Sequence, residues 1–210
     1  MIKILIADDH TIVRKGLKQI IAETSDMIVT DEACDGQEVL NKTRKDSFDM
    51  VLLDISMPGR TGLDILRELK AENPKLPVLV LSMYPEEQYA VRVLKAGASG
   101  YLTKESAPDE LIAAIRKVSM GKRYVTPSLA EKLAFNLQIN SDKPLHENLS
   151  DREYQVMCMI ASGKTVGEIA EKLSLSAKTI STYRARILEK MKMKNNAEIT
   201  HYAIQNRLVA

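Results

Sequence analysis

The chain contains few of the residues that mark secreted or membrane proteins. Among its 210 residues are two cysteines, two phenylalanines and no tryptophan. Cys34 and Cys158 lie far apart in the sequence, which argues against a disulfide framework and favours a reducing compartment. The apolar run at residues 2–7 is too short for a signal peptide, and no run approaches the length of a membrane span. We therefore expect a soluble cytoplasmic protein without membrane contact.

The chain as a whole also lacks a strong charge of one sign, because its formal net charge is only +2. The charge is unevenly distributed, however. From Asn148 onward there are ten Lys and Arg against six Asp and Glu, a net charge of +4, which leaves −2 for the preceding part. This division predicts an acidic module followed by a basic one, and the length allows two small domains.

Strand and helix patterns alternate up to about residue 121. Apolar runs predict strands at residues 2–7, 27–32, 50–53, 78–81 and 101–102. Helical spacing predicts helices at residues 11–24, 36–45, 62–73, 85–96 and 108–120, and Ser106 is placed to cap the last of them. Five strand–helix units in series predict a doubly wound, five-stranded parallel sheet covered by helices on both faces.

The rest of the chain shows no further strand pattern. We expect an extra amphipathic helix at 127–138, then a polar linker at 139–148. Ser150 and Glu153 form a capping-box sequence. Four helices are predicted at residues 151–161, 166–173, 177–192 and 197–206, and a short turn joins the middle two, as in helix-turn-helix units. The expected organisation is an α/β domain at 1–121, an extra helix and linker at 122–148, and an all-α domain at 149–210.

Polar side chains follow four of the predicted strands, at the points where these strands end. They are Asp8, Asp9, Asp54, Ser82, Thr103 and Lys104. The carboxyl ends of parallel strands meet at one edge of a sheet, where ligands bind. Carboxylates gathered there would repel one another unless they shared a cation, and Mg²⁺ prefers oxygen ligands. With a lysine nearby, such a cluster suits phosphoryl transfer onto an aspartate.

A simpler interpretation exists for each residue alone. An aspartate at a strand end is often only a helix N-cap, and a lysine after a strand is usually a solvated surface group. The coincidence at four strand ends favours a site.

These residues resemble the receiver domain of bacterial two-component response regulators. The resemblance is carried by residues 8–10, residues 53–59, Ser82 and residues 100–104, and it covers the chain up to about residue 121. It implies a flavodoxin-like fold and a sensor histidine kinase as partner. It also implies a phosphorelay role in which the protein is phosphorylated.

The resemblance assigns roles to the acidic residues. It implies that Asp54 is the phosphoacceptor. It also implies that Mg²⁺ is bound by Asp9, Asp54 and the backbone carbonyl of Ser56, with Asp8 acting through water.

Three further residues receive roles from the same resemblance. Ser82 would be the switch hydroxyl that moves to a phosphate oxygen, although Thr is commoner at this position. Tyr101 would be the coupled aromatic, with an ordinary strand aromatic as the alternative. Lys104 would contact the phosphate.

The helix predicted at 177–192 is the candidate for nucleic-acid binding. Ile180, Ile187 and Met191 lie on one side and should face a core. Small, polar and basic residues near its start suit entry into the major groove of double-stranded DNA. The candidate contacts are Lys178, Thr179, Ser181, Thr182, Tyr183, Arg184, Ala185 and Arg186. The alternative is a solvated basic helix face.

A second resemblance covers the basic part of the chain. The resemblance is to the LuxR-type DNA-binding domain and is carried by residues 149–153, 161–164, 168–170, Leu173, Ser176 and 178–180, so the whole chain looks like a NarL/FixJ-family regulator. Residues 121–125 and 178–186 look closest to the GacA/UvrY subgroup. Ser181 and Ala185 stand where members often have Lys, and Tyr183 where His is common. Neither Ser181 nor Ala185 can make a bidentate contact to guanine.

The family implies that phosphorylation favours a homodimer, which binds a pseudo-palindromic DNA site and regulates transcription. The last helix offers Ile199, Tyr202, Ala203 and Ile204 either to the core or to a two-fold contact.

Two other function classes remain open. A phosphohydrolase with an Asp nucleophile needs a second Asp two residues later, where this chain has Ser56. We therefore expect only self-phosphorylation and slow self-dephosphorylation, and no enzymatic turnover. The other class is a module that binds protein partners without touching DNA.

Overall fold

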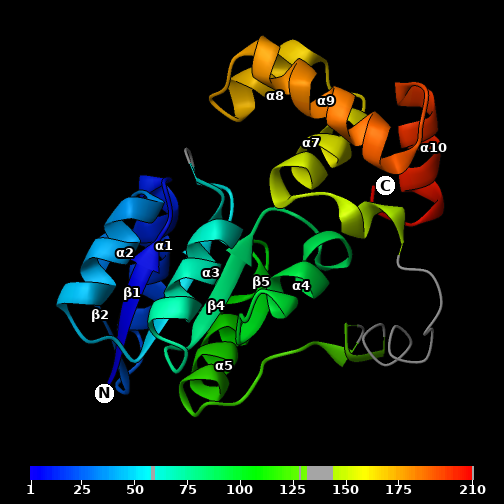
Figure 1. Cartoon of the computed structure of the whole chain (residues 1–210). Coiled ribbons are helices and arrows are strands. Elements are labelled where there is room, and N and C mark those ends of the chain that lie inside the picture. Colours follow the sequence, from blue (N-terminus) through cyan, green and yellow to red (C-terminus); the bar gives the residue numbers. More distant parts are fainter. Residues whose placement is uncertain (58–59, 128, 132–143, 210) are drawn as a thin grey trace. The chain divides into compact units, whose positions relative to one another are not determined.

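A computed structural model describes residues 1–57, 60–127, 129–131 and 144–209. The chain divides into two compact units, Met1–Leu133 and Ala134–Ala210 (Figure 1), which are described separately. Most of the helix predicted at 127–138, and the first half of the linker predicted at 139–148, lie outside the described residues. Among the described helices, none is long and apolar enough to cross a membrane.

The N-terminal unit contains a single five-stranded sheet in the order β2-β1-β3-β4-β5, with every neighbouring pair parallel. Its strands are β1 (Ile2–Ala7), β2 (Met27–Ala33), β3 (Met50–Asp54), β4 (Val78–Ser82) and β5 (Gly100–Thr103). Its helices are α1 (Thr11–Ala22), α2 (Gly36–Lys45), α3 (Gly62–Glu72), α4 (Glu86–Lys95) and α5 (Pro108–Ser119). The predicted doubly wound parallel sheet is confirmed.

Apolar residues on both faces hold the sheet between two layers of helices. All five residues of β3, and all five of β4, are buried, as expected for strands covered on both sides. One face packs on α1 and α5, through a cluster that includes Ile4, Leu52 and Ile115. Successive strand side chains point to opposite faces, so Leu53 and Val80 face the other layer of helices.

The start of α5 differs from the prediction. Its N-cap is Ala107, which makes no side-chain cap bond, and the Ser106 hydroxyl instead lies 3.3 Å from that of Thr103. The prediction that Ser106 caps this helix is therefore wrong. The physical reason is Pro108, which occupies the first turn, has no N–H to satisfy and sets the helical φ itself.

The C-terminal unit is helical. Its described elements are the 3₁₀ turn η1 (Leu145–Asn148) and the α-helices α7 (Asp151–Ala161), α8 (Val166–Lys172), α9 (Ala177–Met191) and α10 (Asn196–Gln205). The predicted capping box of Ser150 and Glu153 is present, and Thr165 and Glu168 form a second one. The turn η1 lies inside the predicted linker and was not expected.

The core of this unit contains the residues that the helical spacing selected. Ile180, Ile187 and Met191 of α9 are buried, as predicted. On α10, Ile199 and Ala203 are buried in the core, whereas Ile204 remains 55% exposed. The helices α8 and α9 are joined by a tight turn in which Ser174 has a φ of 54°. The predicted helix-turn-helix arrangement is therefore confirmed.

Candidate functional site

Three polar residues from separate segments converge at the carboxyl edge of the sheet. Asp54 is the last residue of β3, Asp8 follows β1 and Lys104 follows β5. The Lys104 Nζ atom lies 2.5 Å from Asp54 Oδ2 and 2.6 Å from Asp8 Oδ2. All three side chains are buried, with exposed fractions of 7% for Lys104, 2% for Asp8 and 0% for Asp54. The site therefore holds a lysine between two buried carboxylates.

The sheet topology explains this convergence. The strands β1, β3 and β4 are neighbours, so parallel pairing brings their carboxyl ends together. Lys104 is brought to the same edge because its backbone N–H donates to the carbonyl of Ser82, 2.8 Å away. Arg14 of α1 holds the backbone at Asp8, because its guanidinium donates to the Asp8 carbonyl at 2.7 Å and also pairs with Glu32.

Burial changes the protonation equilibria of the paired residues. Burial raises the pKa of the Asp54 carboxyl, and the nearby Lys104 only partly offsets this effect. For Lys104, burial favours the neutral amine, but the attraction of Asp54 and Asp8 outweighs it and leaves the pKa raised. Lys104 is thus a fixed positive charge beside an Asp54 carboxylate that is poorly solvated.

The acidic cluster, defined as Asp8, Asp9 and Asp54, has more negative charge than Lys104 can neutralise. Among the described residues, the buried oxygens Asp8 Oδ2 and Asp9 Oδ1 each have a single ion-pair partner, Lys104 and His10 respectively. Ligand atoms of the cluster and of His10 lie within 4.8 Å of one another. Carboxylate oxygens gathered this closely fit a hard divalent cation, and the cluster is typical of a magnesium site.

Ser56 contacts Asp54 through its backbone. Its N–H donates to Asp54 Oδ1 at 2.8 Å, while Lys104 holds Oδ2. Both oxygens of Asp54 are therefore oriented. The predicted metal-binding group of Ser56 is its carbonyl, whereas the contact in the structure uses its N–H.

Ser82 and Tyr101 are linked through one loop residue. The buried Ser82 Oγ accepts from the backbone N–H of Tyr84 at 3.0 Å. The Tyr101 hydroxyl donates to the Tyr84 carbonyl at 2.6 Å, and burial raises the pKa of that hydroxyl. The side chain of Tyr101 is 1% exposed. Both predicted switch residues thus hold the loop between β4 and α4 by its backbone.

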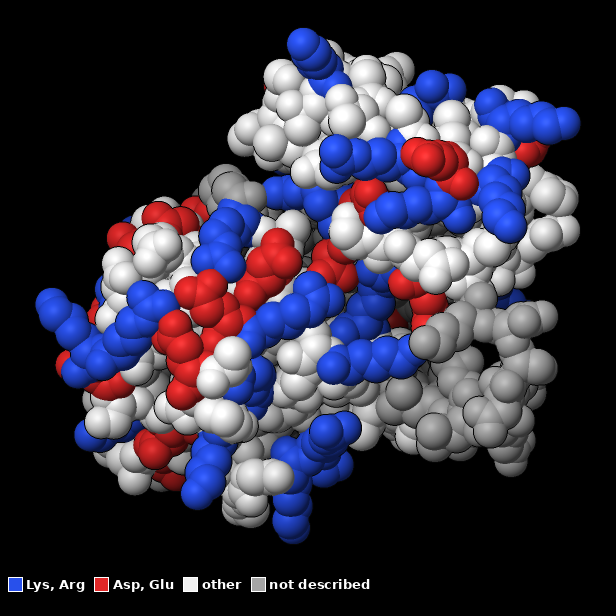
Figure 2. Space-filling model, viewed as in Figure 1, with Lys and Arg blue, Asp and Glu red and all other residues white. Residues whose placement is uncertain are grey.

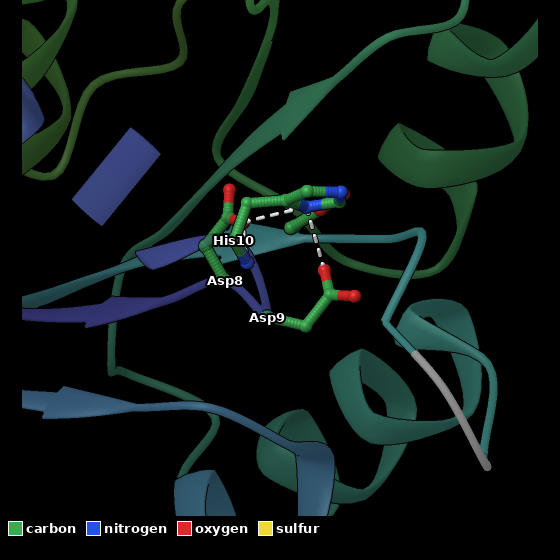
Figure 3. Close-up of side chains that lie close together, drawn as sticks. Asp8, Asp9 and His10 are labelled. Atoms are coloured by element: carbon green, nitrogen blue, oxygen red, sulfur yellow. Dashed lines mark hydrogen bonds and ion pairs between the residues drawn. The ribbon is translucent and has the colours of Figure 1, made fainter. Parts of the chain in front are cut away.

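His10 is the residue of this edge to which sequence reasoning gave no role (Figure 3). Its Nδ1 atom lies 2.9 Å from Asp9 Oδ1 and 3.2 Å from Asp8 Oδ1. Its side chain is 60% exposed, so the ring lies at the mouth of the cluster. The signal in the sequence was its position directly after the two aspartates.

The candidate DNA-binding residues of α9 fall into two groups. Five of them are exposed: Lys178, Ser181, Thr182, Ala185 and Arg186. Thr179, Tyr183 and Arg184 are partly buried, and the Nε of Arg184 donates to Asn196 Oδ1 of α10 at 2.6 Å. Lys and Arg side chains outnumber acidic ones on the face of this unit that Figure 2 shows.

Two family models match the chain. Residues 4–116 match the response regulator receiver domain, and residues 147–203 match the bacterial regulatory proteins of the luxR family. Both matches fall on the two units described above, one on each.

Individual proteins resemble the chain over its whole length. The response regulator GacA of Pseudomonas protegens is 39% identical over 210 residues, which cover 100% of this chain and 98% of GacA. The response regulator UvrY of Escherichia coli K12 is 38% identical over 210 residues, covering 99% and 96%. RcsB of Salmonella enterica, solved bound to the promoter rprA with the phosphomimetic BeF3-, has a TM-score of 0.65 and 28% identity, covering 96% of this chain and 98% of that one. The chain therefore belongs to the two-component response regulators that join a receiver domain to a LuxR-type helix-turn-helix domain.

Proposed function

We propose that this protein is a transcription regulator that accepts a phosphoryl group on Asp54 and then binds DNA as a dimer. The observation that supports this most is the buried triad of Asp54, Asp8 and Lys104, with Lys104 Nζ 2.5 and 2.6 Å from the two carboxylates. Response regulators of this family are not classical enzymes, so the chemistry at Asp54 serves as a signal.

The phosphoryl donor would be a phosphohistidine of a sensor histidine kinase. A carboxylate oxygen of Asp54 attacks phosphorus, a P–O bond forms, and the P–N bond breaks with its electrons returning to the kinase imidazole. Lys104 stabilises the charge on the transferred group, because it already lies beside Oδ2. Ser56 keeps Oδ1 oriented through its N–H.

A magnesium ion would be held by Asp9, Asp54 and the carbonyl of Ser56, with Asp8 acting through water. When bound, it supplies positive charge to the phosphoryl oxygens. The buried oxygens Asp8 Oδ2 and Asp9 Oδ1, each with one ion-pair partner among the described residues, support this assignment.

The signal would leave the site through Ser82 and Tyr101. If the Ser82 hydroxyl turns to a phosphate oxygen, it gives up the N–H of Tyr84. The carbonyl of the same residue is held by Tyr101, so the β4–α4 loop and this ring move together. Phosphorylation then shifts an existing equilibrium, to the extent that phosphate binds one state better.

The output would be binding of α9 in the major groove of double-stranded DNA. Lys178 and Arg186 are exposed and suit phosphate contacts, while the methyl group of Thr182 suits a thymine. Exposed Ile204 on α10 supplies an apolar group for a two-fold contact, which would place two copies of α9 on a pseudo-palindromic site. We assign the receiver to residues 1–121, an extra helix and linker to 122–148 and the DNA-binding domain to 149–210, in a cytoplasmic protein.

Labelling with acetyl phosphate tests the phosphoacceptor. Wild type and Asp64→Asn, a control in the exposed first turn of α3, should take up one phosphoryl group in the presence of Mg²⁺. Asp54→Asn should take up none. Labelling of Asp54→Asn at the wild-type level would show that the phosphoacceptor is another residue, and turnover of small phosphate esters would favour a phosphohydrolase.

A further inference from the structure

His10 places a ring nitrogen against two carboxylates of the acidic cluster (Figure 3). The Nδ1 atom lies 2.9 Å from Asp9 Oδ1 and 3.2 Å from Asp8 Oδ1, so the ring points toward the cluster although most of its surface is exposed. The side chain makes no cap bond to α1, although His10 is the N-cap residue of that helix. Its orientation is therefore set by the carboxylates.

The spacing of His10 Nδ1 and Asp9 Oδ1 fits neighbouring ligands of one metal ion. In an octahedral site with ligand bonds of about 2.1 Å, adjacent ligand atoms lie about 3 Å apart. The 2.9 Å between Nδ1 and Asp9 Oδ1 matches this value. One ligand atom from each of Asp8, Asp9, His10 and Asp54 lies within 4.8 Å of the other three.

A nitrogen ligand changes which metals a site prefers. Mg²⁺ favours oxygen ligands, whereas imidazole suits the later first-row transition metals, whose affinity for nitrogen sites rises from Mn²⁺ toward Cu²⁺. We infer that His10 is an additional ligand of the acidic cluster, which lets the receiver bind a divalent transition metal in competition with Mg²⁺. The inference rests on the proposed magnesium site and adds a residue and a metal class to it.

A hydrogen-bonding role makes the opposite prediction. His10 also donates its backbone N–H to Asp8 Oδ1 at 2.8 Å, and Nδ1–H could donate in the same direction. The ring would then be a hydrogen-bond donor at the position that a metal ion takes, and it would compete with the metal. In that case its removal would strengthen the binding of every divalent metal by a similar factor, because all of them would lose the same competitor.

Calorimetric titration of the unphosphorylated full-length protein with Co²⁺ and with Mg²⁺ separates these cases. All proteins carry Cys34→Ser, because Cys34, Asp35 and Glu38 form a second group that could hold a metal. We expect His10→Ala to lower the Co²⁺ affinity by about tenfold or more and to leave the Mg²⁺ affinity within about twofold. The visible absorption of bound Co²⁺ should change as the nitrogen ligand is lost.

The control is His201→Ala, because His201 is an exposed histidine of α10 that could bind Co²⁺ adventitiously. It should leave both affinities unchanged. Equal changes for Co²⁺ and Mg²⁺ in His10→Ala, or no change for either, would overturn the inference. If Mg²⁺ fails to bind, or binds equally well to Asp9→Asn, the proposed magnesium site itself is wrong, and the two failures are thus distinguishable.

Discussion

At the scale of single residues, the proposed phosphoacceptor Asp54 is a carboxylate that is shielded from water. Its side chain is fully buried, and its two oxygens contact Lys104 and the N–H of Ser56. Burial and the neighbouring Asp8 both raise its pKa, burial more strongly. The unphosphorylated protein without metal therefore holds an ionised carboxylate that is less stable here than in the unfolded chain.

Removing this charge should stabilise the metal-free protein. Asp54→Asn should raise the free energy of unfolding at pH 7 by on the order of 1 kcal/mol. Because the pKa of Asp54 is raised in the folded state, the gain should be absent below the unfolded pKa, near pH 4, and should grow as the pH rises. Urea unfolding in a chelator at several pH values measures it. A loss of stability at pH 7 would contradict this account of Asp54.

Removing the lysine should have the opposite effect. Lys104→Met leaves Asp8 and Asp54 buried without their cation, which should lower stability at pH 7 by about 3–5 kcal/mol. Lys18→Met is the control, because its partner Glu32 is partly exposed and such pairs contribute about 1 kcal/mol or less. Adding Asp54→Asn to Lys104→Met should recover part of the loss. Equal losses for the two lysine variants would exclude a special role for the buried pair.

At the scale of elements, the loop after β3 depends on the close approach of α3. A Cβ atom at Gly62 would lie 2.3 Å from the Cα of Ile55 and 2.8 Å from the carbonyl oxygen of Asp54. Both are backbone atoms, which no side-chain rotation can move away. The glycine therefore fixes the backbone that carries the acidic residue.

This contact predicts a sharp contrast between two glycines. Gly62→Ala should lower the free energy of unfolding by about 1–3 kcal/mol, because the added Cβ displaces the backbone at Asp54. The same displacement should slow labelling by acetyl phosphate. Gly16→Ala is the matched change inside α1, where an added Cβ meets nothing within 4 Å. It should stabilise the protein by about 0.5–1 kcal/mol. Thermal unfolding and labelling of the two variants measure the contrast, and similar behaviour would refute it.

The regular elements were predictable because their signal is local. The strands β3 and β4 are continuous apolar runs, and their carboxyl ends had to meet once the order was parallel. The cap of α5 was missed because Pro108 removes the need for one. The turn η1 has no apolar period, so its polar sequence indicated only a linker.

The contacts of the site were predictable only in part. The parallel strand order predicted that Asp54 and Lys104 lie close together. It did not predict that Tyr101 and Ser82 both contact the backbone of Tyr84. Backbone partners carry no residue signature. The role of Arg184 as a partner of Asn196 likewise depends on how α9 and α10 both pack on α7.

At the scale of the whole molecule, DNA binding should depend on salt through the basic residues of α9. Arg186→Ala should weaken binding to all sequences and reduce the slope of log affinity against log salt by about one. Arg116→Ala is the control, because Arg116 is an exposed arginine of α5, in the receiver, paired with Asp26. It should leave the slope unchanged. Gel shifts over a salt series measure both, and an unchanged slope for Arg186→Ala would place the DNA elsewhere.

The central claim is that phosphate on Asp54 controls DNA binding, and one measurement addresses it directly. The affinity for a DNA site captured from the genome is measured for wild type, Asp54→Asn and Asp64→Asn, before and after incubation with acetyl phosphate and Mg²⁺. The account predicts a gain in affinity, with a shift to dimer, for wild type and Asp64→Asn only. The same gain in Asp54→Asn, or no gain in fully phosphorylated wild type, would contradict it.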